Sequence, residues 1–450
     1  MVRTTVGPPR LLAFLCLSLA AFLGAAAFIT NACGADATPT PLAKVSIAIS
    51  LDHADALYAL GEPAVFTIKV QADEKPVTDG TLEAVITFDQ LKVIKRVPLP
   101  LGEEEYRLSE TLATPGFLHC MVNYRRGHDM KQGSAAAGYE PQRIEATTQM
   151  PEDFAAFWEA GTKALAVIPL DLREEKIPAY DNAKHTASII SVANLDGRRS
   201  WALVTVPLSP GPHPIIIMVP GANPLAPQFP LMEYASRAIT VHISVHPYHP
   251  LAALKDDSLL KPYNWYPMHG APDREHYYFY YAILGASRLI DWAAARPEYD
   301  QKHMVISGGS QGGAFALFMT GLNPHITAAA ADKPALCDHS AYTAGRRPSW
   351  PGLVPQNLPE QQEAYLNMSR YFDGVNFARR ITVPTLFAVG FLDSVCPPGT
   401  VYAAYNSVPG EKKMLHGIPY GHFFNIKEHN EFRDRWIAGE LGLGPRVPLN

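Results

Sequence analysis

The chain contains 450 residues, of which 47% are hydrophobic and 18% are charged, a composition typical of a globular protein with roughly two or three domains. Its formal net charge is −5 and it carries no basic tail, so a role in binding nucleic acid has no electrostatic support. Forty prolines and 32 glycines are spread along the whole chain, which indicates many loops and no low-complexity segment.

The N-terminal segment has the pattern of an export signal. Arg3 and Arg10 precede a long apolar run that contains no charge before Asp36, where small residues supply a cleavage site. We therefore expect residues 1–37 to be a cleaved signal peptide, and the mature protein to be periplasmic or secreted, without a stable membrane span. Two alternatives stay open, because the run is nearly long enough for an uncleaved anchor and Cys33 could carry a lipid.

Three well-separated cysteines follow the signal segment, at positions 120, 337 and 396. They form neither a disulfide framework nor the CxxC or His-rich spacing of a zinc site, so we predict no bound metal. A bridge between Cys337 and Cys396 is compatible with an oxidising compartment, and the sequence leaves it open.

Residues 38–145 carry short segments in which apolar and polar residues alternate, namely KVSIAIS, AVFTIKVQ, TLEAVITF and FLHCMVNYR. Turn signals such as GEP, TDG and TPG separate them. This period of two predicts a small antiparallel β-sandwich of immunoglobulin-like size. The segment contains no cluster of acid, base and nucleophile, so we expect a packing or spacer module, with sugar binding as the alternative role.

From Pro151 onward the pattern changes to strands that alternate with helices. FAAFWEAGTKAL and REHYYFYYAILGASRLIDWAA have apolar residues at helical spacing. The continuous apolar runs that predict strands are WALVTVP, PIIIMVP, AITVHISV, MVIS, ITAAAA, PTLFAVG and KKMLHG. Such alternation predicts a mostly parallel sheet covered by helices on both faces, in one α/β domain at residues 146–450.

The stretch VISGGSQGG crowds glycines around Ser310, directly after a predicted strand and before a predicted helix. In this setting the G-x-S-x-G pattern marks a nucleophile. Gly308 and Gly312 would let the chain turn tightly and the helix pack closely, so that Ser310 projects above the sheet beside free helix amides. The alternative is a phosphate-binding glycine loop, but the lysine of such a loop is missing. We therefore predict that Ser310 is the nucleophile.

A serine nucleophile needs a base and an orienting acid, which in the α/β-hydrolase fold follow it in the order Ser, acid, His. Asp393 directly follows the predicted strand PTLFAVG and is the predicted acid, with capping of a helix near Pro397 as its alternative role. Asp338, after the preceding strand, is the rival acid. His422 lies in the loop before the last helix and is the predicted base, whereas His416 ends a strand and is expected in the core.

At this point the sequence resembles the acetyl xylan esterases and cephalosporin-C deacetylases of carbohydrate esterase family seven, which have the α/β-hydrolase fold. The likeness covers most of residues 150–440, through PEDFAAFW, the lead-in to GGSQGG, DSVCPPGTVYAAYN and the C-terminal histidine. GGSQGG and DSVCPPGTVYAAYN are specific for this family when they occur together. The resemblance implies a triad of Ser310, Asp393 and His422, and no metal or cofactor.

The resemblance also implies an oxyanion hole formed by the backbone N–H groups of Gln311 and Ala222. Two departures from the family pattern stand out. His246-Pro247-Tyr248 replaces the Arg-Gly-Gln element, and Phe423 replaces the glutamate that usually follows the catalytic histidine. Family members typically form a ring-like hexamer, which leaves a homo-oligomer open for this chain.

Together these features predict an exported serine esterase that removes acetyl groups from xylan, xylo-oligosaccharides or other small acetyl esters. The YNWY stretch at 263–266 and Trp350 are expected either to stack on sugar rings or to cover the fold. One alternative is a serine peptidase of the prolyl-oligopeptidase type, but about one hundred sandwich residues are too few for its β-propeller. The other is a non-catalytic carbohydrate-binding protein, against which an ordered Ser, Asp and His argues.

Overall fold

The computed structural model describes residues 44–222, 234–252 and 256–449, and the predicted signal peptide at 1–37 lies outside them. The described residues form one compact unit. In the described part of the chain, no helix is both long and apolar enough to cross a membrane.

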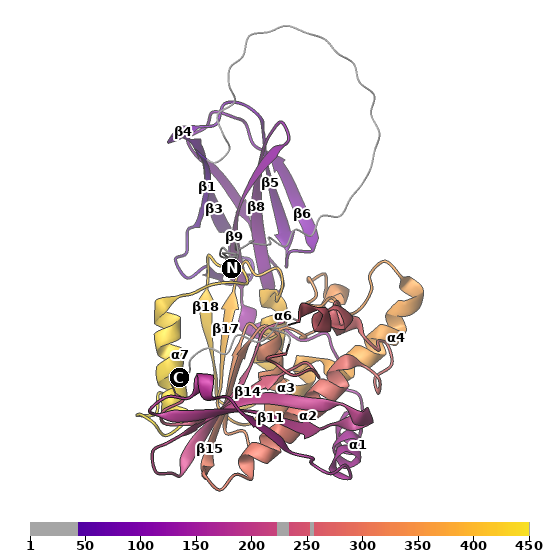
Figure 1. Ribbon diagram of the computed structural model, residues 1–450. Coiled ribbons are helices and arrows are strands. Elements are labelled where there is room, and N and C mark those ends of the chain that lie inside the picture. Colours follow the sequence, from indigo (N-terminus) through magenta and orange to yellow (C-terminus); the bar gives the residue numbers. More distant parts are fainter. Residues whose placement is uncertain (1–43, 223–233, 253–255, 450) are drawn as a thin grey trace, which may run out of the picture. The chain divides into compact units, whose positions relative to one another are not determined.

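The first nine strands form two sheets, one of four strands and one of five (Figure 1). The four-stranded sheet contains β1, β3, β4 and β7, and the other has the order β2-β9-β8-β5-β6. All neighbouring strands are antiparallel except the short β2 beside β9. The strands are β1 (Val45–Leu51), β2 (Leu57–Tyr58), β3 (Ala64–Ala72), β4 (Lys75–Pro76), β5 (Thr81–Phe88), β6 (Lys92–Pro98), β7 (Tyr106–Glu110), β8 (Gly116–Arg126) and β9 (Asp129–Tyr139).

Alternating side chains from both sheets form the core between them. Phe66 and Ile68 of β3 pack in one cluster with Ile86 of β5 and with Leu118 and Val122 of β8. The apolar positions of each strand lie two residues apart, because successive side chains point to opposite faces of a sheet. This arrangement is the β-sandwich that the alternating segments predicted.

The remaining nine strands form one mixed sheet with the order β10-β11-β12-β14-β13-β15-β16-β17-β18. From β14 to β18 all pairs are parallel, whereas β10, β11, β12 and β14 pair antiparallel. The strands are β10 (Arg173–Lys176), β11 (His185–Ala193), β12 (Arg199–Pro207), β13 (His213–Val219), β14 (Ile239–Ser244), β15 (Tyr299–Gly309), β16 (Ala328–Asp332), β17 (Thr385–Gly390) and β18 (Lys412–Gly417).

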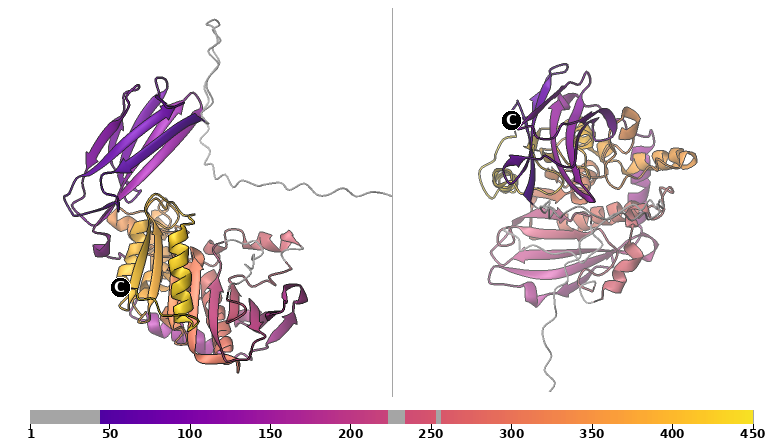
Figure 2. Two further views of the ribbon diagram at one scale, coloured as in Figure 1. Left: turned by 90° about the vertical axis from the view of Figure 1, so that its left-hand side faces the viewer. Right: turned by 90° about the horizontal axis from the view of Figure 1, so that it is seen from above.

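Helices cover both faces of this sheet (Figure 2). Ile215 and Ile217 of β13 face one cluster, which includes residues of α1, α2, α3, α5 and α6, whereas Ile216 faces the other with Trp436 of α7. The helices are α1 (Phe154–Ala166), α2 (Tyr278–Ala294), α3 (Gln311–Leu322), α4 (Pro359–Ser369), α5 (Gly374–Ala378), α6 (Pro398–Ser407) and α7 (Lys427–Glu440). The prediction of an α/β-hydrolase fold is confirmed.

The long helix predicted from Arg274 begins four residues later, at Tyr278. The carboxylate of Asp273 accepts hydrogen bonds from the backbone N–H groups of Glu275 and His276, at 2.9 and 3.2 Å. Such a local turn competes with the first helical turn for the same amides, which explains the later start.

The three cysteines of the described chain, at 120, 337 and 396, are free and buried, so the bridge between Cys337 and Cys396 that the sequence left open is not formed there. Burial raises the pKa of the Cys120 thiol to about 12, which keeps it neutral at physiological pH. These thiols therefore contribute to the cores as small apolar side chains.

Candidate active site

Strand β15 runs directly into helix α3 through a sharp turn at Ser310. The backbone of Ser310 has φ 58° and ψ −121°, which residues with a side chain rarely adopt. A Cβ on Gly308 would lie 2.5 Å from backbone atoms of Gly312, and a Cβ on Gly312 would lie 2.1 Å from the carbonyl oxygen of Val219. Side chains at the two elbow glycines would therefore collide with the turn itself and with the neighbouring strand.

Ser310, His422 and Asp393 come together from the ends of three parallel strands, β15, β18 and β17. His422 Nε2 lies 3.1 Å from Ser310 Oγ, and His422 Nδ1 lies 2.8 Å from Asp393 Oδ2. Because a carboxylate only accepts hydrogen bonds, Nδ1 carries the proton and Nε2 accepts from the serine hydroxyl. This arrangement can remove the serine proton as the oxygen attacks a carbonyl carbon.

The carboxylate of Asp393 is fully buried and held by its own loop. Asp393 Oδ1 accepts hydrogen bonds from the backbone N–H groups of Val395 and Cys396, both at 2.8 Å. Its other oxygen thereby remains directed at His422. Helix α6 begins at Pro398 without a side-chain cap, so Asp393 does not have the alternative capping role.

The two remaining candidates have other partners. His416 lies on β18, and its Nε2 is 2.6 Å from the hydroxyl of Tyr402. Burial lowers the pKa of His416, which favours the neutral ring. The side chain is partly buried on its strand, less enclosed than the core position that the sequence predicted, and its partner is Tyr402.

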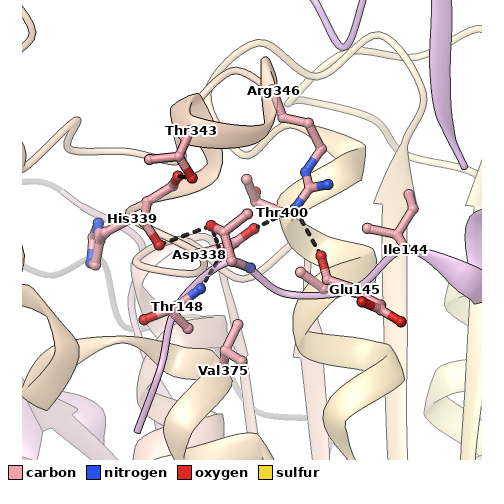
Figure 3. Close-up of polar contacts among 12 residues, drawn as sticks. Ile144, Glu145, Thr148, Asp338, His339, Thr343, Arg346, Val375 and Thr400 are labelled. Atoms are coloured by element: carbon pink, nitrogen blue, oxygen red, sulfur yellow. Dashed lines mark hydrogen bonds and ion pairs between the residues drawn. The ribbon is translucent and has the colours of Figure 1, made fainter. Parts of the chain in front are cut away.

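Asp338, the rival acid, binds the segment that precedes α1 (Figure 3). Asp338 Oδ1 accepts from the backbone and hydroxyl of Thr147, at 2.8 and 2.7 Å, and from the backbone of Thr148 at 3.0 Å. Its other oxygen accepts from Arg346 at 3.1 Å, and the same guanidinium donates to the carbonyl of Glu145 at 2.8 Å. Asp338 is thus committed to anchoring residues 145–148.

The two proposed oxyanion donors, Gln311 and Ala222, come from different segments of the chain. Gln311 is the first residue of α3, where helix amides have no partner within the helix. At Gly221 the chain passes close to the serine, since a Cβ on this residue would lie 3.9 Å from Ser310 Cβ, and Ala222 follows directly. That these two amides bind the oxyanion stays a prediction.

An aromatic cluster occupies the place of the family's Arg-Gly-Gln element. The His246 ring stacks on Tyr248 and meets Tyr266 edge-on, with ring centroids 5.2 and 4.8 Å apart. Tyr266 donates its hydroxyl to Gln311 Oε1, and burial raises the pKa of Tyr266 above its usual range, so that it stays protonated. Tyr266 is therefore buried support for α3, whereas Trp265 beside it is 84% exposed.

The sequence did not place two other residues beside Ser310, His422 and Asp393. The sulfur of Cys396 lies within 4.8 Å of a carboxylate oxygen of Asp393 and a ring nitrogen of His422, whereas the sequence considered Cys396 only as half of a possible disulfide. Gln90, from the sandwich, donates to the backbone carbonyl of Asp393 at 2.8 Å. No local pattern could indicate Gln90, because it is 303 positions away from its partner.

Comparisons with known proteins identify the family of the chain. The family model "Acetyl xylan esterase" matches residues 140–436. The acetyl esterase Axe7A of Xylanibacter ruminicola is 31% identical over 405 residues, which cover 87% of this chain and 89% of that protein. Because this match is longer than the chain beyond residue 139, it includes part of the sandwich.

Two solved structures show the same fold. Acetyl xylan esterase 1 from Thermoanaerobacterium sp. JW/SL YS485 superposes with a TM-score of 0.58 at 20% identity, over 67% of this chain and 98% of that one. The acetyl xylan esterase from Paenibacillus sp. R4 superposes with a TM-score of 0.56 at 26% identity, with the same coverage. The chain therefore belongs to the acetyl xylan esterase family and is a carboxylic ester hydrolase acting on carbohydrate acetyl esters.

Proposed function

We propose that this esterase cleaves acetyl esters through a triad of Ser310, His422 and Asp393. The observation that carries the proposal is the continuous hydrogen-bond chain from Ser310 Oγ through His422 to the buried Asp393 carboxylate. Ser310 Oγ attacks the acetyl carbonyl while His422 Nε2 takes its proton, and His422 then returns the proton to the leaving sugar oxygen. Water, activated by the same histidine, releases acetate and frees the serine.

The test of this mechanism compares three variants. Ser310→Ala and His422→Ala should each lower kcat for p-nitrophenyl acetate by about 10³-fold or more, because triad members act as a unit. His416→Ala should keep kcat within a fewfold and instead lower the melting temperature, since it removes a partly buried hydrogen bond. A dipeptidyl anilide, assayed beside the ester, should not be cleaved.

Retention of most of the ester turnover by Ser310→Ala, with an intact thermal transition, would remove Ser310 from the mechanism. Cleavage of the anilide at a comparable rate would favour the peptidase alternative.

We further propose that the carbohydrate part of the substrate contacts Phe423, and that the protein acts on acetylated xylan or xylo-oligosaccharides after export. Phe423 is 91% exposed, and its ring centroid lies 5.0 Å from that of His422 in an edge-on arrangement. A large apolar ring that is almost fully exposed contributes little to the packing of the fold, apart from this contact with His422. The C–H faces of a pyranose are the partners that such a ring accommodates.

Phe423→Ala should raise KM for acetylated xylo-oligosaccharides about two- to tenfold, the range expected for one ring contact. The same variant should leave kcat and KM for ethyl acetate unchanged, since that ester has no ring in the place of the sugar. Steady-state acetate release with both substrates measures the two effects. Equal changes for both substrates would instead show that Phe423 acts by positioning the ring of His422.

A further inference from the structure

The turn between β5 and β6 brings the sandwich to the loop of the proposed catalytic acid. This turn consists of residues 89–91, and Gln90 Nε2 donates to the backbone carbonyl of Asp393 at 2.8 Å. Both residues are shielded from solvent, Asp393 fully and Gln90 in part. The contact therefore joins a sandwich side chain to the main chain of the residue that orients His422.

The backbone of this turn favours glycine, yet side chains are present. Asp89 and Gln90 have φ angles of 43° and 58°, in the left-handed region that glycine enters without steric cost. Asp73 and Glu74 have the same backbone conformation in an exposed turn, so this conformation alone indicates no function. The turn at 89–91 differs because the side chains of Asp89 and Gln90 both point into the catalytic part of the molecule.

Contacts of Asp89 fix the turn that presents Gln90. The Asp89 amide donates to the carbonyl of Phe117 at 2.8 Å, and its carbonyl accepts from the amide of Arg347 at 3.1 Å. The Asp89 carboxyl group is buried against α6, because a Cβ on Gly399 would lie 2.8 Å from Asp89 Oδ1. The turn is thus bonded to both the sandwich and the catalytic part, which fixes the position of the Gln90 backbone.

The bond from Gln90 completes the fixation of Asp393. The amide of Asp393 donates to Gly390 at 3.2 Å, and its carboxylate accepts from the loop and from His422. Its carbonyl is the remaining main-chain group, and Gln90 binds it. A small rotation of this peptide would turn the carboxylate away from His422, and general-base catalysis depends steeply on such alignment.

We propose that Gln90 is a positioning residue for the triad acid, so that the sandwich supplies part of the catalytic geometry. This inference rests on the proposed triad. It gives the sandwich a role in turnover rather than that of a spacer alone.

Gln90→Gly separates this role from a structural one. Glycine adopts the left-handed backbone without strain, which stabilises the folded variant, but it loses more backbone entropy on folding, which destabilises it. Because these two effects oppose each other, the melting temperature should stay near that of the wild type. Turnover of p-nitrophenyl acetate should fall about three- to tenfold in kcat, as expected for one lost hydrogen bond, with KM nearly unchanged. Phosphonylation of Ser310 by a fluorophosphonate should slow by the same factor.

Two further variants serve as comparisons. Gln90→Glu keeps the length of the side chain but has no donor when ionised, so it should lose kcat like Gln90→Gly. Glu74→Gly is the matched control, because Glu74 has φ 65° in an exposed turn between β3 and β4, and it should leave kcat unchanged.

Three outcomes would overturn the proposal. Wild-type kcat in Gln90→Gly beside an inactive Ser310→Ala would refute the role of Gln90 and leave the triad standing. Fluorophosphonate labelling at saturation counts the folded enzyme. If kcat in Gln90→Gly falls only in proportion to the amount of folded enzyme, the role of Gln90 is structural. Full activity in Ser310→Ala would refute the triad and the role of Gln90 together.

Discussion

Asp338 and Asp393 are both fully buried, and their partners give them different roles. Asp393 directs one oxygen at His422, whereas both oxygens of Asp338 are taken by Thr147, Thr148 and Arg346. The donors around Asp338 anchor residues 145–148, so this carboxylate is bonded to that segment and not to His422. At the scale of the residue, the partners of each carboxylate decide which aspartate can serve the proposed triad.

Asp89 gives the folded protein a pH dependence of its own. Burial raises its pKa to about 7, a rise that Arg346 opposes and Asp338 reinforces. In the unfolded chain this carboxyl group loses its proton near pH 4. Between these values the folded state binds more protons than the unfolded state, so this group makes the free energy of unfolding fall as the pH rises from about 4 to 7.

We expect Asp89→Asn to remove this contribution. Urea unfolding at pH 5 and pH 8 should show a loss of stability in the wild type that exceeds the loss in the variant by about 1–3 kcal/mol. Asp73→Asn, at an exposed position paired with Lys44, is the control and should behave as the wild type. An identical pH dependence in the wild type and Asp89→Asn would show that Asp89 does not titrate in this range.

At the scale of the element, the turn from β15 to α3 requires glycine at specific positions only. An added Cβ on Gly312 meets the carbonyl oxygen of Val219 at 2.1 Å, whereas one on Gly309 meets Asp332 Cβ at 3.7 Å, an ordinary contact. Gly312→Ala must therefore displace the turn or the strand, while Gly309→Ala need not.

We expect Gly312→Ala to lower kcat for p-nitrophenyl acetate by about 100-fold, the effect of misplacing a nucleophile by about 1 Å. It should also destabilise the fold by about 1–3 kcal/mol through overpacking. Gly309→Ala should cause a much smaller loss of both. Activity and thermal melting of the two variants measure the difference. Similar losses in both variants would show that the contact with Val219 is not what makes glycine necessary at position 312.

For the molecule as a whole, the sequence predicted those features that depend on residues close together in the chain. The alternating strands, the glycine-rich turn at Ser310 and the order of Asp393 and His422 follow from nearby residues, so they could be read directly. Strands β10 and β11 were not predicted, since β10 is short, exposed and without an apolar pattern, and serines interrupt the apolar run of β11. The contacts of Gln90 and Tyr266 depend on residues brought together only by the fold, which no spacing rule reaches.

The division into a sandwich at 38–145 and a catalytic domain at 146–450 stays a proposal, and the packing shows why a boundary there is not simple. Phe117 of the sandwich strand β8 is fully buried in the same cluster as the core of the catalytic sheet. Its ring lies edge-on to Phe391, with centroids 5.0 Å apart. Phe117 lies on the outer side of its strand, so its ring becomes buried only when the catalytic part of the chain packs against the sandwich.

The distance along the chain between Gln90 and Asp393 has a consequence for the order of folding. Contacts that close loops of 303 and 191 residues, such as Gln90 with Asp393 and Thr147 with Asp338, carry a large entropic cost and form late. A chain that emerges from its N-terminus completes the sandwich before it supplies His422. Because the proposed triad needs this histidine, ester hydrolysis has to wait until the chain has been made at least as far as His422.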